Sequence, residues 1–137
     1  RMCLLKMGDR EQLANAALLW ISRAKLIEVN DEIYCAESMA NTAKMSINPA
    51  LRWLSYEDKI KKPLQMAKKI NPSNPRVYLL EANIQRKLPV LFGGGCKQAI
   101  PIAKKAEQFL NNQTSSDKLL PGWGRQSLIE FKTACPY

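Results

Sequence analysis

The chain has 137 residues, of which 46% are hydrophobic and 24% charged, and these proportions are those of an ordinary globular domain. We therefore expect a single domain over residues 1–137. With 21 basic and 12 acidic residues the net charge is +9, which favours polyanionic partners. The sequence has no histidine, which excludes Ser-His-Asp and Cys-His catalysis by this chain alone. No apolar segment approaches the roughly 20 residues that a membrane-spanning helix needs.

Hydrophobic residues recur at helical spacing and nowhere alternate as in a strand, so the sequence predicts an all-α fold. Six helices are expected, over about residues 10–28, 32–47, 56–70, 75–87, 96–110 and 124–134. In the first helix, Asp9 is the expected N-cap. Leu13 and Trp20 belong to the stripe that should face the core.

Polar residues and a proline mark the ends of the second and third helices. Asp31 is the expected N-cap of the second helix. Asn48-Pro49 should end it, because the residue before a proline is driven out of the helical conformation. A loop that carries Trp53 should follow, and Ser55 is the expected N-cap of the third helix.

The fourth helix is bounded by clear signals at both ends. Asn74 is its expected N-cap, Pro75 occupies its first position, and Pro89 should end it. The glycines at 93–95 then permit a tight turn, against which we expect Phe92 to pack. A phosphate-binding loop is disfavoured, because the GK[ST] motif and a preceding strand are both missing.

One pattern occurs twice, with a period of about 43 residues. Residues 24–37 read AKLIEVNDEIYCAE, and residues 67–81 read AKKINPSNPRVYLLE. Each copy is the end of one helix, a polar turn and the start of the next helix, with Tyr34 equivalent to Tyr78. Such self-similarity is typical of stacked helical hairpins, which usually bind other molecules rather than transform them.

The hairpins resemble tetratricopeptide repeats (TPR), which place small residues where two helices touch. Residues from about 31 to 135 also resemble a TPR-like family found in some bacteria. The resemblance rests on four ordered segments, MSINPALRW, AKKINPSNPRVYLLEA, VLFGGGCKQAIPIAKKAEQF and LPGWG. It implies antiparallel helical hairpins stacked as a short TPR-like superhelix, export to the periplasm or cell envelope, and no catalytic residues. The role of that family is unassigned.

The four cysteines are far apart and form no CxxC motif, so no zinc site is expected. Cys96 begins the fifth helix and Cys135 follows the sixth, so a disulfide forms if these helices pair antiparallel. Two buried free thiols are the other interpretation. Cys3 and Cys35 have the same relation across the first two helices.

The leading hypothesis is a non-enzymatic scaffold that binds a protein or peptide and needs no cofactor or metal. The candidate contacts lie on the outward side of the second and fourth helices, at Asn41, Lys44, Asn83 and Arg86. These side chains would suit a peptide with carboxylates. The alternative is a basic module that binds nucleic acid or an anionic surface. Nucleic acid is disfavoured, because the basic residues are scattered and no aromatic residues alternate with them.

Overall fold

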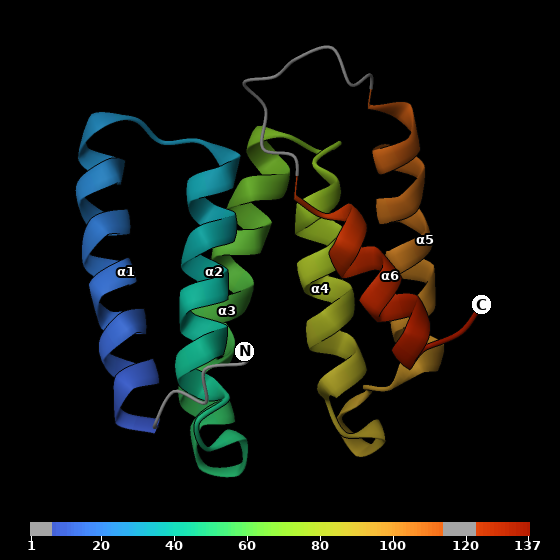
Figure 1. Ribbon diagram of the computed structural model, residues 1–137, viewed down its shortest axis with the longest axis horizontal. Helices are drawn as coiled ribbons and strands as arrows, with labels where there is room; N and C mark the ends of the chain where they lie inside the picture. The colour runs from blue at the N-terminus through green and yellow to red at the C-terminus, as the bar shows by residue number, and fades with distance from the viewer. Residues whose placement is uncertain (1–6, 114–122) are drawn as a thin grey trace. The chain divides into compact units, whose positions relative to one another are not determined.

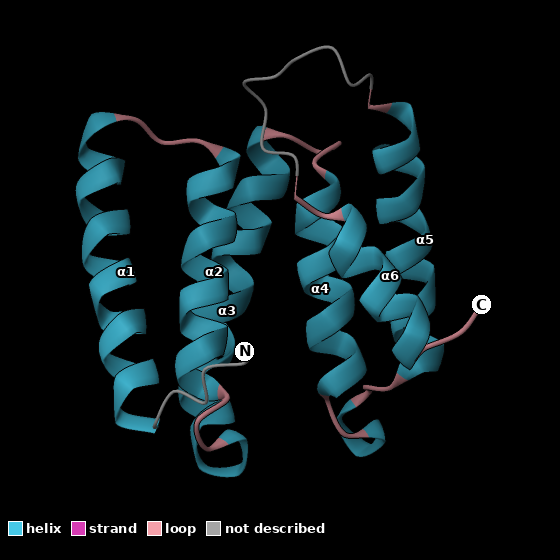
Figure 2. Cartoon of the chain, in the orientation of Figure 1, coloured by secondary structure: helices cyan, strands magenta, loops and turns pink. Residues whose placement is uncertain are grey.

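The computed structural model describes residues 7–113 and 123–137, and these residues contain helices and no strand, which confirms the all-α prediction (Figures 1 and 2). The elements are α1 (Met7–Ile27), α2 (Asp31–Met45), α3 (Pro49–Ile70), α4 (Pro75–Lys87), the short 3-10 helix η1 (Val90–Phe92), α5 (Cys96–Asn112) and α6 (Arg125–Ala134).

The chain forms two compact units, Arg1–Asn71 and Pro72–Tyr137, which we call unit 1 and unit 2. The described part of unit 1 consists of α1, α2 and α3, and unit 2 contains α4, η1, α5 and α6. The expectation of a single TPR-like domain over residues 1–137 stays a prediction.

In unit 1, the central helix α2 packs against both α1 and α3 (Figure 1). The buried side chains of α2 include the small residues Cys35, Ser38 and Ala40. Small side chains let two helices approach closely, and here the Ser38 Oγ donates a hydrogen bond to the carbonyl of Ile60 on α3, at 2.9 Å. This buried bond fixes the register of α2 on α3.

The expected starts of α2 and α3 were wrong. Asn30, not Asp31, caps α2, since its Oδ1 accepts a hydrogen bond from the Ile33 amide at 2.9 Å. Helix α3 begins at Pro49, so the predicted loop and the Ser55 cap do not exist. Proline does push the preceding residue out of helical conformation, but its fixed φ and missing N–H suit the first position of a new helix.

The expected core face of α1 is one position out of register. Leu13 and Trp20 are 56% and 66% exposed, whereas Ala14 is buried and Leu18 half-buried. Helix α1 packs closely on α2 and reaches α3 through the ion pair of Glu11 with Arg52 at 3.1 Å, so only a narrow stripe of α1 is covered. The helix also begins at Met7, which places Asp9 inside its first turn instead of at the N-cap.

In unit 2, α4 and α5 pair closely through alanines. Ala82, Ala99 and Ala103 are fully buried and form one cluster with Phe131 and Cys135 from the end of the chain. The start of α4 confirms the prediction, because the Asn74 Oδ1 accepts a hydrogen bond from the Arg76 amide at 2.9 Å and Pro75 is the first helical residue.

Cys96 and Cys135 form a disulfide that links the start of α5 to the residue after α6, with 5.4 Å between their Cα atoms. The bond closes a loop with a sequence separation of 39. It therefore restricts the unfolded chain and holds α6 on α5. The suggested pairing of Cys3 with Cys35 stays a prediction, because Cys3 lies outside the described residues.

We expect the double variant Cys96→Ala/Cys135→Ala to lower the free energy of unfolding by about 2–4 kcal/mol, because the unfolded chain regains the entropy of the open loop. Urea unfolding with and without reductant measures this. Reductant should shift the midpoint of the wild type and leave that of the variant unchanged. An unshifted wild-type midpoint would contradict the disulfide.

The end of the chain is held by a polar cluster around Glu107 on α5. Lys132 and the Tyr137 hydroxyl both donate hydrogen bonds to this carboxylate. The hydrogen bond from Lys132 lowers the pKa of Glu107. Burial, followed by the hydrogen bond to Glu107, raises the pKa of Tyr137 to about 12.

The raised pKa of Tyr137 predicts a loss of stability at high pH. The folded chain keeps a proton that the unfolded chain releases near pH 10, so this contribution is complete below pH 10 and disappears as pH approaches about 12. Ultraviolet titration of tyrosinate should show a late step that Tyr137→Phe lacks. A Tyr137→Phe titration identical in shape to that of the wild type would refute the assignment.

Candidate functional site

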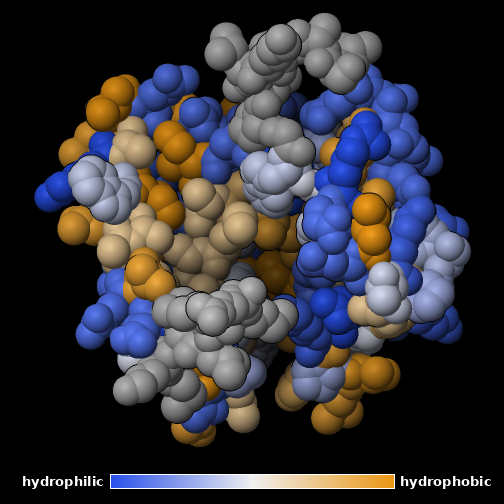
Figure 3. All heavy atoms as spheres, in the orientation of Figure 1, coloured by the Kyte–Doolittle hydropathy of each residue, from blue (hydrophilic) through white to orange (hydrophobic). Residues whose placement is uncertain are grey.

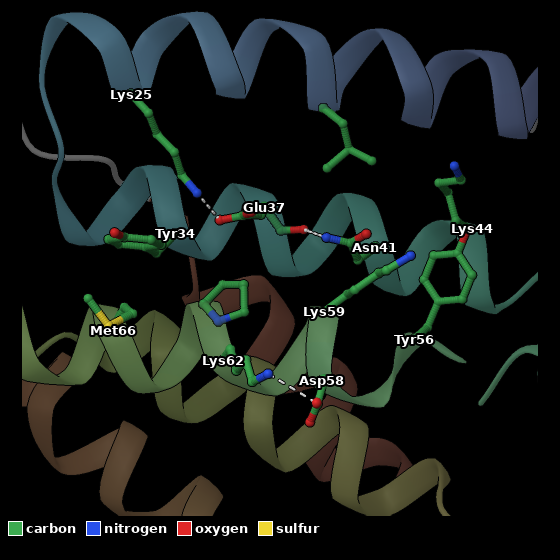
Figure 4. A pocket seen from close by; sticks show the side chains of 12 residues that line it. Lys25, Tyr34, Glu37, Asn41, Lys44, Tyr56, Asp58, Lys59, Lys62 and Met66 are labelled. Atoms are coloured by element: carbon green, nitrogen blue, oxygen red, sulfur yellow. Dashed lines mark hydrogen bonds and ion pairs between the residues drawn. The ribbon is translucent and has the colours of Figure 1, made fainter. Parts of the chain in front are cut away.

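A cavity of about 530 Å³ lies in unit 1, and residues of all three helices line it (Figure 4). Its walls combine aromatic, basic and apolar side chains, a mixture typical of sites for small organic ligands. The lining residues are Leu18, Lys25, Tyr34, Glu37, Asn41, Lys44, Tyr56, Asp58, Lys59, Lys62, Pro63 and Met66.

Helical periodicity brings these side chains to one place. On α2, Tyr34, Glu37, Asn41 and Lys44 follow one another at steps of three or four residues, so they share one face of the helix. The lining residues of α3 between Tyr56 and Met66 follow the same rule. The cavity is therefore bounded by one continuous stripe from each of two helices packed together.

Two ion pairs neutralise part of the charge in the cavity. Lys25 of α1 pairs with Glu37 of α2, and Lys62 pairs with Asp58 on α3 at 3.1 Å (Figure 4). The first pair links α1 to α2 beside Tyr34, and the Lys25 Nζ also lies 4.6 Å from the centre of the Tyr34 ring. Both carboxylates of the cavity are thus already paired with lysines.

Lys44 and Lys59 are left without a carboxylate partner among the described residues. Both lie over the Tyr56 ring, with their Nζ atoms 5.9 and 4.9 Å from its centre. The Lys44 Nζ also donates a hydrogen bond to the Asn15 Oδ1 at 2.6 Å. The cavity consequently keeps a positive charge beside an aromatic ring, an arrangement that attracts a flat ligand with carboxylates.

Of the four predicted contact residues, two line this cavity. Lys44 does so as a half-buried side chain. Asn41 is only 6% exposed, and its Nδ2 donates a hydrogen bond to the Glu37 carbonyl at 3.0 Å. The expectation that Asn41 points outward was wrong, because α1 and α3 flank α2 on both sides and cover this position.

The other two predicted residues, Asn83 and Arg86, belong to α4 in unit 2. Their side chains bond to each other, from the Arg86 Nη2 to the Asn83 Oδ1 at 3.3 Å. The Asn83 Nδ2 donates a hydrogen bond to the Leu79 carbonyl, at 3.1 Å. These local bonds occupy the Asn83 amide, whereas the buried Arg86 Nε has no hydrogen-bond partner within the described residues. The role of both residues in binding stays a prediction.

The predicted contact residues did not include Tyr56, Lys59, Lys62 and Met66, which line the cavity. The signal was present, since these residues follow one another at steps of three or four along one face of a predicted helix. The importance of these residues depends on the face of α2 that lies opposite them. They could not be recognised as a site because the sequence did not assign the pairing of α2 with α3.

A second hollow in unit 1, of about 600 Å³, lies between α1 and α2 and is largely apolar. The exposed side chains of Leu13, Trp20 and Met39 line it. Over residues 7–113 and 123–137, no helix is long and apolar enough to cross a membrane. No group of three or more His, Cys, Asp or Glu residues within this part of the chain is placed to hold a metal ion.

Comparison with known proteins identifies one informative similarity. The chain is similar to the solved structure of the HusA haemophore from Porphyromonas gingivalis, with 32% sequence identity and a TM-score of 0.84. The match covers 95% of this chain but 65% of the haemophore, so the chain spans less than two thirds of that protein. No protein-family model matches the sequence. The curated proteins contain no significant match.

Proposed function

We propose that the cavity between α1, α2 and α3 binds haem, and that the chain is a non-enzymatic haem-binding protein. The observation that carries this proposal is the pair of lysines, Lys44 and Lys59, that lies over the Tyr56 ring without a carboxylate partner among the described residues. The similarity to a haemophore supports it independently, because the name of that protein describes a haem carrier.

The chemistry of the cavity fits the ligand. Haem is a flat aromatic ring with two carboxylates on one edge, so an aromatic or apolar wall suits the ring and cations suit the carboxylates. Tyr34, Leu18 and Met66 supply the wall, and the two lysines supply the cations. The volume of about 530 Å³ lies within the range of about 300–1,000 Å³ that is usual for sites of small organic ligands.

The chain can also provide a ligand for the iron without a histidine. Tyrosine and methionine both serve as axial ligands of haem in proteins, and the cavity contains residues of both types. Tyr56 is the tyrosine that we assign to this role, because it lies beside Lys44 and Lys59, the two lysines that would hold the carboxylates of the ligand.

A protein- or peptide-binding scaffold of the TPR-like type is the second candidate. The apolar hollow between α1 and α2 favours it, because the exposed Trp20 and Leu13 there resemble the anchors of a peptide groove. The repeat in the sequence supports the stacking of hairpins as a TPR-like superhelix. Electrostatic binding of nucleic acid has no comparable site among the described residues to support it.

The haem proposal is tested by titrating the protein with hemin and following the Soret absorbance. We expect Lys44→Ala/Lys59→Ala to weaken binding by roughly tenfold, since two partly exposed ion pairs with the propionates are lost. Tyr56→Phe should change the position of the Soret band. Lys69→Ala is the matched control, because this exposed lysine of α3 does not line the cavity.

Substitution of Glu37 should raise the affinity for hemin, whereas loss of the lysines lowers it. The substitution Glu37→Gln removes a negative charge from the cavity and releases Lys25 from its ion pair. Hemin should then bind several-fold more tightly, and the gain should shrink at high ionic strength. The same titration at two salt concentrations measures it.

Two results would refute the haem site. One is wild-type protein that produces no Soret shift with hemin, and the other is a double lysine variant that binds as tightly as Lys69→Ala. If a carboxylate-bearing peptide binds instead, and Trp20→Ala abolishes this binding, the scaffold candidate takes precedence.

A further inference from the structure

The turn between α4 and α5 presents an exposed apolar tip, formed by the side chains of Val90, Leu91 and Phe92. These three consecutive residues are 77%, 90% and 67% exposed. In Figure 3, hydrophobic residues gather at this end of unit 2, where α4 meets η1. Phe92 was expected to pack against the glycine turn, and this expectation was wrong.

Backbone hydrogen bonds and the Gln85 side chain, whose Nε2 donates to the Gly93 carbonyl, close the turn without the side chains of residues 90–92. The Phe92 and Gly94 amides donate hydrogen bonds to the Pro89 carbonyl at 2.9 and 3.1 Å, and the Gly95 amide donates one to the Gln85 carbonyl at 2.9 Å. Gly93 adopts a left-handed conformation with φ of 76°. A Cβ on Gly94 would lie 2.0 Å from the Leu88 carbonyl oxygen, so this glycine permits the close packing of the turn.

The charged residues that flank the tip along the chain are all basic. From Ala82 to Ala106 the sequence contains no acidic residue. Lys87 precedes the tip and Lys97 follows it, and both are exposed. An exposed apolar group between exposed lysines combines the two attractions that bind a protein to an anionic bilayer, which are burial of apolar area and electrostatic attraction to the headgroups.

We propose that this tip inserts into the headgroup region of a membrane that contains anionic lipids, and that unit 2 is thereby held at the membrane surface. The tip lies at the turn between α4 and α5 with three consecutive apolar side chains exposed, so it suits a deformable lipid surface. Lys87 and Lys97 would contact the lipid phosphates while Leu91 and Phe92 enter the acyl boundary. This membrane contact uses no residue of the haem cavity and stands or falls independently of it.

A second exposed apolar pair provides a matched control. Leu26 and Ile27, at the end of α1, are 87% and 89% exposed, but Glu28, Asp31 and Glu32 follow them closely in the sequence. If exposed apolar area alone drove binding, both sites would act equally. The acidic neighbours should exclude this second site from an anionic surface.

The test is co-sedimentation of the chain with vesicles of phosphatidylcholine alone or mixed equally with phosphatidylglycerol. The wild type should bind the mixed vesicles, and Leu91→Glu/Phe92→Glu should bind them roughly tenfold or more weakly. Leu26→Glu/Ile27→Glu should bind like the wild type. Circular dichroism verifies that both variants keep their helices, which is expected because the altered side chains are exposed.

The lysines are tested separately. Lys87→Ala/Lys97→Ala should reduce binding to the mixed vesicles in low salt and have little effect in high salt, where the attraction is screened. The proposal is overturned if the wild type fails to bind the mixed vesicles, or if the control pair reduces binding as much as the tip pair. Binding equal on both vesicle types would refute the role of anionic headgroups.

Discussion

The fold depends on helices that approach one another closely at small buried side chains. In unit 1 this contact is the buried bond between Ser38 and the Ile60 carbonyl, and in unit 2 it is the packing of Ala82 against Ala99 and Ala103. Close packing of backbones fixes the rotation of each helix. Because α2 is fixed on α3 in this way, the larger side chains on the neighbouring stripe of both helices converge on one cavity.

Part of the net positive charge of the chain is concentrated in the cavity of unit 1, at Lys44 and Lys59. An exposed or half-exposed lysine keeps its hydration and costs little free energy, so two uncompensated ammonium groups can persist at an open site. Their position over the Tyr56 ring provides some attraction in the absence of a ligand. A ligand with carboxylates would replace this weak contact with a stronger one. The positive charge of the chain therefore favours a particular ligand only where lysines lie beside an aromatic ring, as they do at Tyr56.

Local sequence signals predicted where helices occur better than they predicted which faces of those helices are buried. The cap at Asn74 with Pro75 was read correctly, because proline and a polar cap act through the backbone nearby. At Asn48-Pro49 the same chemistry begins a helix as readily as it ends one, so the start of α3 was missed. The exposure of Trp20 could not be predicted, since it depends on which other helices cover α1. Lys44 of the cavity was among the predicted contacts, but Lys59 and Lys62 were overlooked, because their importance depends on the pairing of α3 with α2.

In the turn at residues 88–95, the shape and the exposed apolar surface depend on different parts of the chain. Its shape rests on amide hydrogen bonds and on the two glycines at 93 and 94, whereas the side chains at 90–92 contribute little to it. Folding therefore places almost no constraint on the identity of those three residues. During evolution they are free to change with whatever surface they meet, and an engineer can exchange them for another short recognition sequence without redesigning the helices on either side.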